Sequence, residues 1–281
     1  MASAIEIKDL VYEYPDTTKA IDQLSLTIPL GAKVAILGPN GAGKSTLLHH
    51  FNGLKLPQNG TVTVMGIPLN KKTVRTIRQK VGLVFQDPDD QVFSGTVWED
   101  VQFGPRNLGL SEEEIQEVSE VALGSVGMLE FKTKAPYHLS YGQKKRVAIA
   151  GILAMKPDIV ILDEPMAYLD PRGQDEVAGL LQGLNFMGKT IILSTHDVDF
   201  AASWADMIIL IKDGQVLAVG GPELLVDEES IRSAHLHLPR IARLFRMLPN
   251  FTSESLPKNE QEAVKALYHM LYTKERANES G

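Results

Sequence analysis

The stretch Gly38-Pro39-Asn40-Gly41-Ala42-Gly43-Lys44-Ser45 decides how the rest of the chain is interpreted. It follows the apolar run Val34-Ala35-Ile36-Leu37 and leads into Thr46-Leu47-Leu48, so a strand, a glycine-rich loop and a helix are expected in succession. This order is the context in which the pattern G-x-x-x-x-G-K-[ST] binds phosphate groups. The stretch therefore predicts a nucleotide-binding site.

The residue types of this loop explain how it could hold phosphates. Gly38, Gly41 and Gly43 allow positive φ angles and a close approach of the backbone to an anion. The backbone N–H groups and the positive end of the following helix would then face the phosphates. Lys44 adds a positive charge for the outer phosphates, and Ser45 offers a hydroxyl group to Mg²⁺.

The composition excludes several classes of protein. The chain has 281 residues, of which 44% are hydrophobic and 22% charged, enough for one large domain and an appendage. It contains no cysteine, which excludes disulfides and thiolate metal sites and is typical of a reducing cytoplasm. We find no apolar run of the roughly 18 residues that a membrane-spanning helix needs, and no signal peptide. The net charge of −7 argues against a nucleic-acid partner, whose binding surface should be basic.

Apolar runs predict a mainly parallel sheet whose strands end at polar residues. Residues 158–163 and 188–195 are expected to be buried strands, ending at Asp163-Glu164 and just before His196-Asp197. The carboxyl ends of such strands are where α/β sheets bind ligands. Further strands are expected over residues 5–14, 24–28, 33–37, 60–64 and 82–85, with a hairpin formed by 207–211 and 216–219.

Two regions depart from this pattern. The polar segment Asp87-Pro88-Asp89-Asp90-Gln91 indicates the start of an inserted helical subdomain, residues 87–157. Within it, Ser111-x-x-Glu114 predicts a capping box for a helix that ends near Leu123, and residues 147–155 predict another helix. Residues 223–281 predict a helical appendage with two amphipathic helices. Their apolar residues at helical spacing are Ile241, Leu244, Phe245 and Leu248, then Val264, Leu267, Tyr268 and Leu271, with residues 249–257 between them.

The order of the later motifs closely resembles the ATP-binding subunits of ABC transporters. The motifs of that family are matched by Gly38–Ser45 (Walker A), Gln86 (Q-loop), Leu139-Ser140-Tyr141-Gly142-Gln143 (signature), Ile159–Asp163 followed by Glu164 (Walker B), Leu169-Asp170 (D-loop) and His196 (H-loop). The resemblance covers about residues 5–222. It implies an α/β fold in which residues 1–222 form a P-loop ATPase core with a mainly parallel sheet, an antiparallel β subdomain and the inserted helical subdomain.

A narrower resemblance concerns the energy-coupling-factor branch of this family. Residues 85–91 and Phe103-Gly104-Pro105 are similar to that branch, and residues 138–155 are most similar to its cobalt and nickel importer ATPases. The resemblance implies ATP hydrolysis that powers import of a trace nutrient, with cobalt or nickel favoured over a vitamin such as biotin or riboflavin. Tyr141 stands where glycine is commoner, but Gly142 is retained, so little change in ligand approach is expected. Tyr168 stands where a small residue is usual.

The resemblance implies a role for each matched residue. Lys44 and the loop amides would hold the phosphates of ATP, and Ser45 would bind Mg²⁺ directly. Asp163 would bind Mg²⁺ through water, and Gln86 would contact Mg²⁺ or the attacking water. Glu164 would be the general base, or would orient that water. The expected metal ligands are Ser45, Gln86 and Asp163, and the expected catalytic residues are Glu164, His196 and Gln86.

Other matched residues would complete the ATP site. Tyr14 alone would be assigned to packing at a strand edge, but the resemblance makes it the residue that stacks on adenine. His196 would hold the γ-phosphate. Ser140 and Gly142 would approach ATP bound to the opposite subunit. The expected cofactor-binding residues are Tyr14, Gly38, Pro39, Asn40, Gly41, Ala42, Gly43, Lys44, Ser45, Thr46, Ser140, Gly142 and Gln143.

The implied partners are a second ATPase subunit, a transmembrane coupling protein and a substrate-binding membrane subunit. A homodimer is favoured over a heterodimer, the appendage would help to pair the subunits, and the protein would lie peripherally on the cytoplasmic face of the cell membrane. Soluble ABC ATPases of DNA repair or translation are the alternative class, but they need coiled-coil insertions or tandem nucleotide domains. A metal-binding protein is a further alternative because of His49-His50 and His235-x-His237, although adjacent helical histidines point about 100° apart.

Overall fold

The computed structural model describes residues 2–248, 251 and 256–278, with side chains described as far as residue 270. Its central sheet has the strand order β10-β9-β3-β8-β7-β6. All neighbouring pairs are parallel except β9 and β10, which form the predicted hairpin. The strands are β3 (Lys33–Leu37), β6 (Val81–Val84), β7 (Ile159–Asp163), β8 (Thr190–Thr195), β9 (Met207–Lys212) and β10 (Gln215–Gly220). The predicted α/β class and mainly parallel sheet are confirmed.

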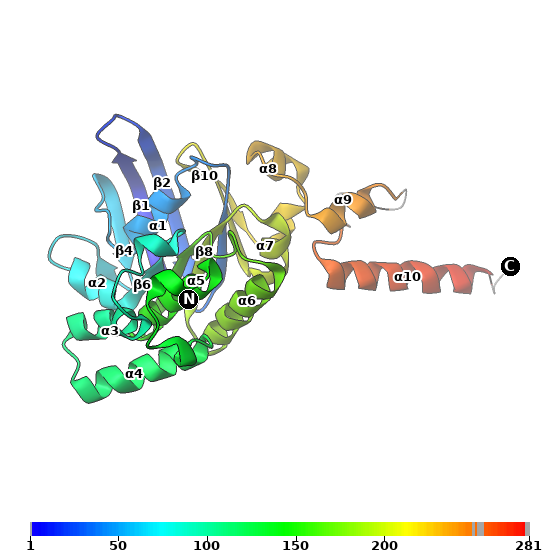
Figure 1. Ribbon diagram of the computed structural model, residues 1–281. Helices are drawn as coiled ribbons and strands as arrows, with labels where there is room; N and C mark the ends of the chain where they lie inside the picture. Colours follow the sequence, from blue (N-terminus) through cyan, green and yellow to red (C-terminus); the bar gives the residue numbers. More distant parts are fainter. Residues whose placement is uncertain (1, 249–250, 252–255, 279–281) are drawn as a thin grey trace.

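A second, antiparallel sheet lies on one side of the molecule (Figure 1). Its strands are β2 (Lys19–Pro29), β1 (Ser3–Glu13), β4 (Asn59–Val64) and β5 (Ile67–Pro68), in that order. Alternate residues of the central strands share its core: Ile36 and Ile161 pack with this sheet and with helix α1 (Lys44–Phe51). Their neighbours Leu37 and Leu162 belong to the other core, beneath the remaining helices. The central sheet is therefore covered on both faces, as its continuous apolar runs predict.

Three helices are inserted between β6 and β7: α3 (Val97–Leu108), α4 (Glu112–Ser125) and α5 (Tyr141–Leu153). The predicted capping box of Ser111 and Glu114 is present at the start of α4. Helix α5, however, begins at Tyr141 and not at Val147, so the predicted start was wrong by six residues. Ser140 and Gln143 form a further capping box, which moves the beginning of the helix to the signature itself.

Six further α-helices are described besides α1, α3, α4 and α5, and three of them precede residue 222. They are α2 (Val74–Lys80), α6 (Pro171–Phe186), α7 (Val198–Trp204), α8 (Glu228–Ser233) and α9 (Arg240–Arg246), with the last helix being α10 (Glu260–Asn278). Helix α10 projects from the body of the molecule (Figure 1). Among the described helices, none has both the length and the apolar character required to cross a membrane.

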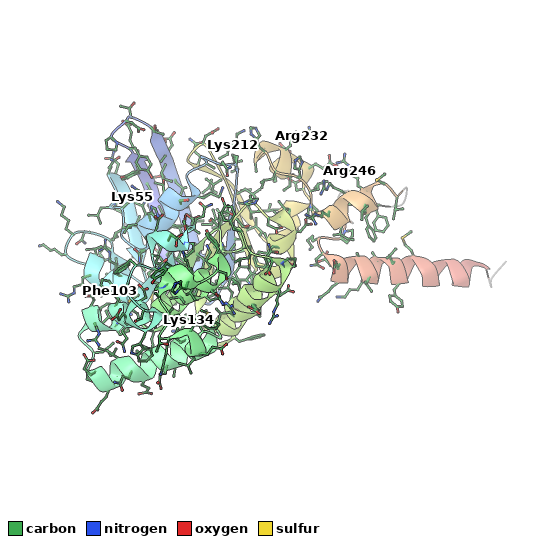
Figure 2. All side chains as sticks on the ribbon, in the orientation of Figure 1. Lys55, Phe103, Lys134, Lys212, Arg232 and Arg246 are labelled. Atoms are coloured by element: carbon green, nitrogen blue, oxygen red, sulfur yellow. The ribbon has the colours of Figure 1, made fainter. Side chains whose placement is uncertain are left out.

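The predicted apolar stripes of the appendage divide between the core and the surface. Phe245 of α9 is buried in the same core as α3, α4 and α5, whereas Leu244 is 61% exposed. Arg246 pairs with Glu228 across 3.2 Å, which joins α9 to α8; Figure 2 labels Arg246. On α10, the stripe residues Val264, Leu267 and Tyr268 are exposed. The side chain of Leu271 and most of residues 249–257 lie outside the described part.

A buried histidine, His50, packs helix α1 against the antiparallel sheet. The Nδ1 atom of His50 lies 2.8 Å from the carbonyl oxygen of Thr46, and the ring packs edge-on against Tyr12. Burial lowers the pKa of His50 to about 4. The pair His49-His50 thus includes one side chain that packs the core, and the described residues contain no cluster of three or more metal-ligand side chains.

This histidine makes folding sensitive to acid. Because the unfolded pKa is 6.5 and the folded value is about 4, the unfolded chain binds more protons between these limits. Stability should therefore fall as the pH falls from 6.5 toward 4, with His50 contributing about 2 to 3 kcal/mol to the loss by pH 4.5. Replacing His50 with Gln should reduce the difference in unfolding free energy between pH 7 and pH 4.5, measured in urea. His237→Gln, at an exposed position, is the matched control, and an unchanged pH dependence in His50→Gln would contradict the assignment.

Candidate functional site

The glycine-rich loop joins β3 to α1, as the sequence predicts. Gly43 stands at the N-cap of α1 with a φ of 98°. A Cβ atom at Gly43 would lie 2.3 Å from the carbonyl oxygen of Ala20, so a larger residue does not fit there. No side chain caps this end of α1, which leaves the N–H groups of its first turn facing outward for an anion.

Lys44 folds back over the loop that precedes it. Its Nζ donates to the carbonyl oxygens of Gly38 at 2.8 Å and Pro39 at 3.1 Å. Burial lowers the pKa of Lys44, and the negative charges of Glu164 and Asp163 oppose that shift. The ammonium group is thus held between the loop and two carboxylates, in the position of a fixed positive charge for phosphate oxygens.

Two buried carboxylates end strand β7. Asp163 is 5% exposed and Glu164 is 8% exposed. The hydroxyl group of Ser194, which is in register with Asp163 on β8, donates to the Asp163 carboxylate and accepts the N–H of Glu164 at 3.0 Å. Glu164 has a φ of 45°, a left-handed conformation that costs about 1 to 2 kcal/mol in a residue with a side chain. Ser194 therefore fixes the carboxylate of Asp163 and the backbone at Glu164, although no sequence motif pointed to it.

His196 approaches the second carboxylate. Its Nδ1 atom lies 2.9 Å from Oε2 of Glu164. Because a carboxylate can only accept, Nδ1 must carry the proton in this contact. The side chain of His196 is 69% exposed, which leaves Nε2 available for a further hydrogen bond. His196 can therefore bridge the carboxylate and an anion.

One cavity of about 1030 Å³ gathers most of the predicted residues. The carboxyl ends of β9, β3, β8, β7 and β6 form one row, so the residues that follow these strands share an edge of the sheet. The predicted residues that line the cavity are Tyr14, Gly38, Pro39, Asn40, Gly41, Ala42, Gly43, Lys44, Ser45, Thr46, Gln86, Asp163, Glu164 and His196.

The signature residues lie elsewhere. Ser140, Gly142 and Gln143 do not line this cavity among the described residues. The backbone N–H of Gln143 donates to Ser140 Oγ at 3.3 Å, and Gln143 Oε1 accepts the N–H of Ser140 at 2.9 Å. The structure thus gives Gln143 a capping role and separates the signature from the loop of its own chain.

Tyr14 is fixed at the other end of the cavity. Its hydroxyl lies 2.9 Å from Thr46 Oγ1, and its ring packs edge-on against Tyr12. The Nζ atom of Lys55, which Figure 2 labels, lies 4.4 Å from the ring centroid. Tyr14 therefore packs against its neighbours and also lines the cavity, so the two interpretations made from the sequence are compatible.

The cavity wall also contains two residues that the sequence did not assign to it, one of which, His235, was considered only as a metal ligand. His235 and Leu236, just after α8, belong to its wall. The Nε2 atom of His235 lies 3.0 Å from Nζ of Lys212, which stands at the end of β9 and is labelled in Figure 2. Their distance in sequence from every motif explains why no local pattern could have placed them.

The glycine-rich loop, the buried carboxylates and the parallel sheet together define a P-loop nucleotide-binding domain. Residues 21–167 match the family model described as "ABC transporter". The energy-coupling factor transporter ATP-binding protein EcfA of Carboxydothermus hydrogenoformans is 48% identical, over 97% of this chain and 100% of its own length. EcfA of Methanocaldococcus jannaschii is 51% identical, over 87% of this chain and 88% of its own. This chain belongs to the ABC transporter family, among the energy-coupling factor transporter ATP-binding proteins.

Solved structures agree with this assignment. The structure of cbiO1 from Clostridium perfringens, part of the ABC transporter complex cbiONQ, has a TM-score of 0.75 at 41% identity and covers 88% of this chain and 100% of its own. A dimer of the ATP-binding cassette MJ0796 with ADP and phosphate has a TM-score of 0.71 at 31% identity, covering 78% of this chain and 98% of its own. The expected ABC ATPase fold and ATP-hydrolysing activity are confirmed.

The position of Ser194 generates a prediction. Ser194→Ala removes the donor to buried Asp163 and the acceptor for Glu164 N–H, so the Asp163 carboxylate and the backbone that carries Glu164 should lose their fixed orientation. The turnover number for ATP should fall about tenfold, and more Mg²⁺ should be needed for half-maximal rate. Steady-state ATPase assays across a Mg²⁺ titration measure both effects. Ser203→Ala, which removes a hydroxyl bonded to Phe200 on the surface, should behave as wild type; equal Mg²⁺ curves for all three proteins would refute the role.

Proposed function

We propose that this chain binds and hydrolyses ATP between two subunits, and thereby powers a membrane importer for cobalt or nickel ions. The observation that carries the proposal is the division of the site. One cavity holds the phosphate-binding loop, both carboxylates and His196, while Ser140 and Gly142 lie outside it on the same chain. A second subunit would bring its own signature to this cavity and complete the site.

Within one subunit, the loop residues Gly38 to Thr46 would hold the phosphates of ATP. Lys44 and the first-turn N–H groups of α1 supply positive charge, and the exposed part of Tyr14 offers a face for adenine. The oxygen donors of Ser45, Gln86 and Asp163 line the same cavity and suit Mg²⁺, which takes few protein ligands beside phosphates and water. When bound, Mg²⁺ would neutralise charge on the phosphates.

Hydrolysis would depend on Glu164 and His196. Glu164 is oriented by Ser194 through its N–H group and by His196 through its carboxylate, so it can accept a proton from an attacking water or orient that water. His196 would contact the γ-phosphate through Nε2. Gln86, which follows the edge strand β6, would contact the attacking water or Mg²⁺.

The signature would act across the dimer. Ser140 is the N-cap of α5, so its hydroxyl and the N–H groups of Gly142 and its neighbours stand at the positive end of a 13-residue helix. This end can bind the γ-phosphate of ATP held by the other subunit. ATP would thus join two subunits, and hydrolysis would release them.

We further propose that residues 1–222 form the ATPase domain, that residues 87–157 form its inserted subdomain, and that residues 223–281 contribute to dimerisation. The exposed apolar residues Val264, Leu267 and Tyr268 on α10 support a protein partner for the appendage. We favour a homodimer; the full set of catalytic residues in one chain would let each of two equal sites hydrolyse ATP, and it fits a heterodimer equally well.

The membrane partner would contact a groove of about 540 Å³ between the inserted subdomain and the segment that contains α2 and β6. Phe93 and Phe103 lie at its wall, with ring centroids 5.1 Å apart, and Figure 2 labels Phe103. Asp90 also lines the groove, whereas Asp89 pairs with Lys144 at 2.6 Å. The mainly apolar groove also has acidic side chains, Asp90 and Asp100, and basic ones, Arg75 and Arg78, at its wall. Such a groove suits a short amphipathic segment of a transmembrane coupling protein, and this would hold the chain at the cytoplasmic face of the membrane.

A charge reversal tests the groove. Asp90→Lys should abolish transport in cells, because it reverses one charge at the wall of the groove, while ATP binding to the purified subunit stays normal. Uptake assays and nucleotide titrations measure the two properties. Glu117→Lys, on the exposed side of α4, is the matched control. Normal uptake by Asp90→Lys would exclude the groove as the contact.

Replacement of the Glu164 carboxylate by an amide tests its role as the catalytic base. Glu164→Gln cannot accept a proton, so the turnover number should fall about a hundredfold or more, while ATP affinity is retained. The variant should elute as a dimer in ATP and as a monomer without it. Lys44→Ala should instead lose ATP binding. A Glu164→Gln protein that hydrolyses ATP at the wild-type rate would remove Glu164 from this role.

The cargo is proposed from the similarity of residues 138–155 to cobalt and nickel importer ATPases, with a vitamin as the second candidate. In a strain that lacks this gene, complementation should restore cellular cobalt or nickel, measured by elemental analysis. Restored uptake of biotin or riboflavin, without a change in either metal, would favour the vitamin importer.

A further inference from the structure

Two side chains of α5 donate to one backbone carbonyl beside the nucleotide cavity. The Nζ atom of Lys145 lies 2.6 Å from the carbonyl oxygen of Gln86, and the hydroxyl of Tyr141 lies 3.0 Å from the same atom. Lys145 Nζ also lies 3.5 Å from the carbonyl oxygen of Phe85. Gln86, two residues after β6, is therefore bonded to the first two turns of the signature helix.

Lys145 has little freedom to leave this contact. Its side chain is fully buried, and burial lowers its pKa to about 8. A buried amine that loses its acceptors pays the cost of desolvation without compensation. The carbonyl groups of Phe85 and Gln86 are the acceptors that the structure gives it, so displacement of α5 from this loop would be costly.

Tyr141 adds a contact that the glycine commoner at this position could not make. Its hydroxyl donates to Gln86, and its ring meets Tyr168 edge-on with centroids 5.4 Å apart. Tyr168 follows β7 in the left-handed conformation, with a φ of 61°. The phenolic hydroxyl of a tyrosine carries its proton at neutral pH, so Tyr141 can donate to the carbonyl oxygen of Gln86. The expectation that Tyr141 changes little was therefore incomplete.

We propose that Tyr141 and Lys145 are positioning residues, which make Gln86 follow the movements of α5. The proposal rests on the function proposed above, in which Gln86 serves ATP in its own subunit and Ser140 serves ATP in the other. A shift of α5 that brings Ser140 to the partner's ATP would then move Gln86 in the same step. The two ATP sites of the dimer are thereby linked through one carbonyl group in each subunit.

The test uses the full-length protein and a double-mutant cycle. Tyr141→Phe removes the hydroxyl and keeps the ring, so it should lower the turnover number about fivefold and leave the KM for ATP within about twofold of wild type. If Tyr141 acts through Gln86, the same change in a Gln86→Ala protein should lower turnover no further. Tyr137→Phe, at a tyrosine that is 76% exposed on the same subdomain, is the matched control.

Two results would overturn the proposal. The first is wild-type turnover in Tyr141→Phe, and the second is an equal loss in the wild-type and Gln86→Ala backgrounds, which a purely structural contact would give. If Gln86→Ala alone has wild-type turnover, Gln86 has no catalytic role, and Tyr141 and Lys145 then have no catalytic residue to position.

Lys145 is tested by two further variants. Lys145→Arg keeps a donor and Lys145→Met does not, so higher turnover in Lys145→Arg than in Lys145→Met supports the donor role. An equal loss of turnover in both variants, in proteins of equal melting temperature, contradicts it.

Discussion

The register of the parallel strands is the constraint on which the site depends. Leu37 pairs with Thr195 and Asp163 pairs with Ser194, so the chain leaves β3, β8 and β7 at the same level. The phosphate-binding loop, His196 and Glu164 therefore emerge side by side without any direct bond between the loop and the carboxylates. A slip of one residue in β7 would turn Asp163 toward the opposite face of the sheet. The apolar residues that pack on both faces of the sheet hold this register. The packing of the core therefore also determines the geometry of the catalytic residues.

The site also contains local strain. Glu164 and Tyr168 both have left-handed backbone conformations, within five residues after β7. Such conformations persist only where surrounding contacts fix them. For Glu164, the contacts are the hydroxyl of Ser194 and the ring of His196; for Tyr168, the ring of Tyr141 is one of them. The turn that carries the proposed base is therefore fixed by β8 on one side and by the signature helix on the other.

Much of this arrangement could be predicted from the sequence, because it depends on local pattern. Apolar runs located the strands, and the glycine-rich loop located the phosphate site; α1 begins at Lys44, two residues before the expected Thr46. The start of α5 was missed although Ser140 and Gln143 formed a recognisable capping pair, since they had been interpreted only as signature residues. Ser194, His235 and the bond from Tyr141 to Gln86 could not be predicted, because each depends on the packing of segments far apart in the chain.

The cap of α5 has a consequence for the proposed dimer. A serine hydroxyl has one proton to donate and two lone pairs that accept. Ser140 accepts the N–H of Gln143 with a lone pair, so its proton stays free to point away from the helix. The same oxygen can thus complete its own helix and donate to a phosphate of the neighbouring subunit without exchanging one bond for the other. The N-terminus of α5 is already formed in the single subunit, so association of the subunits requires no local unfolding there.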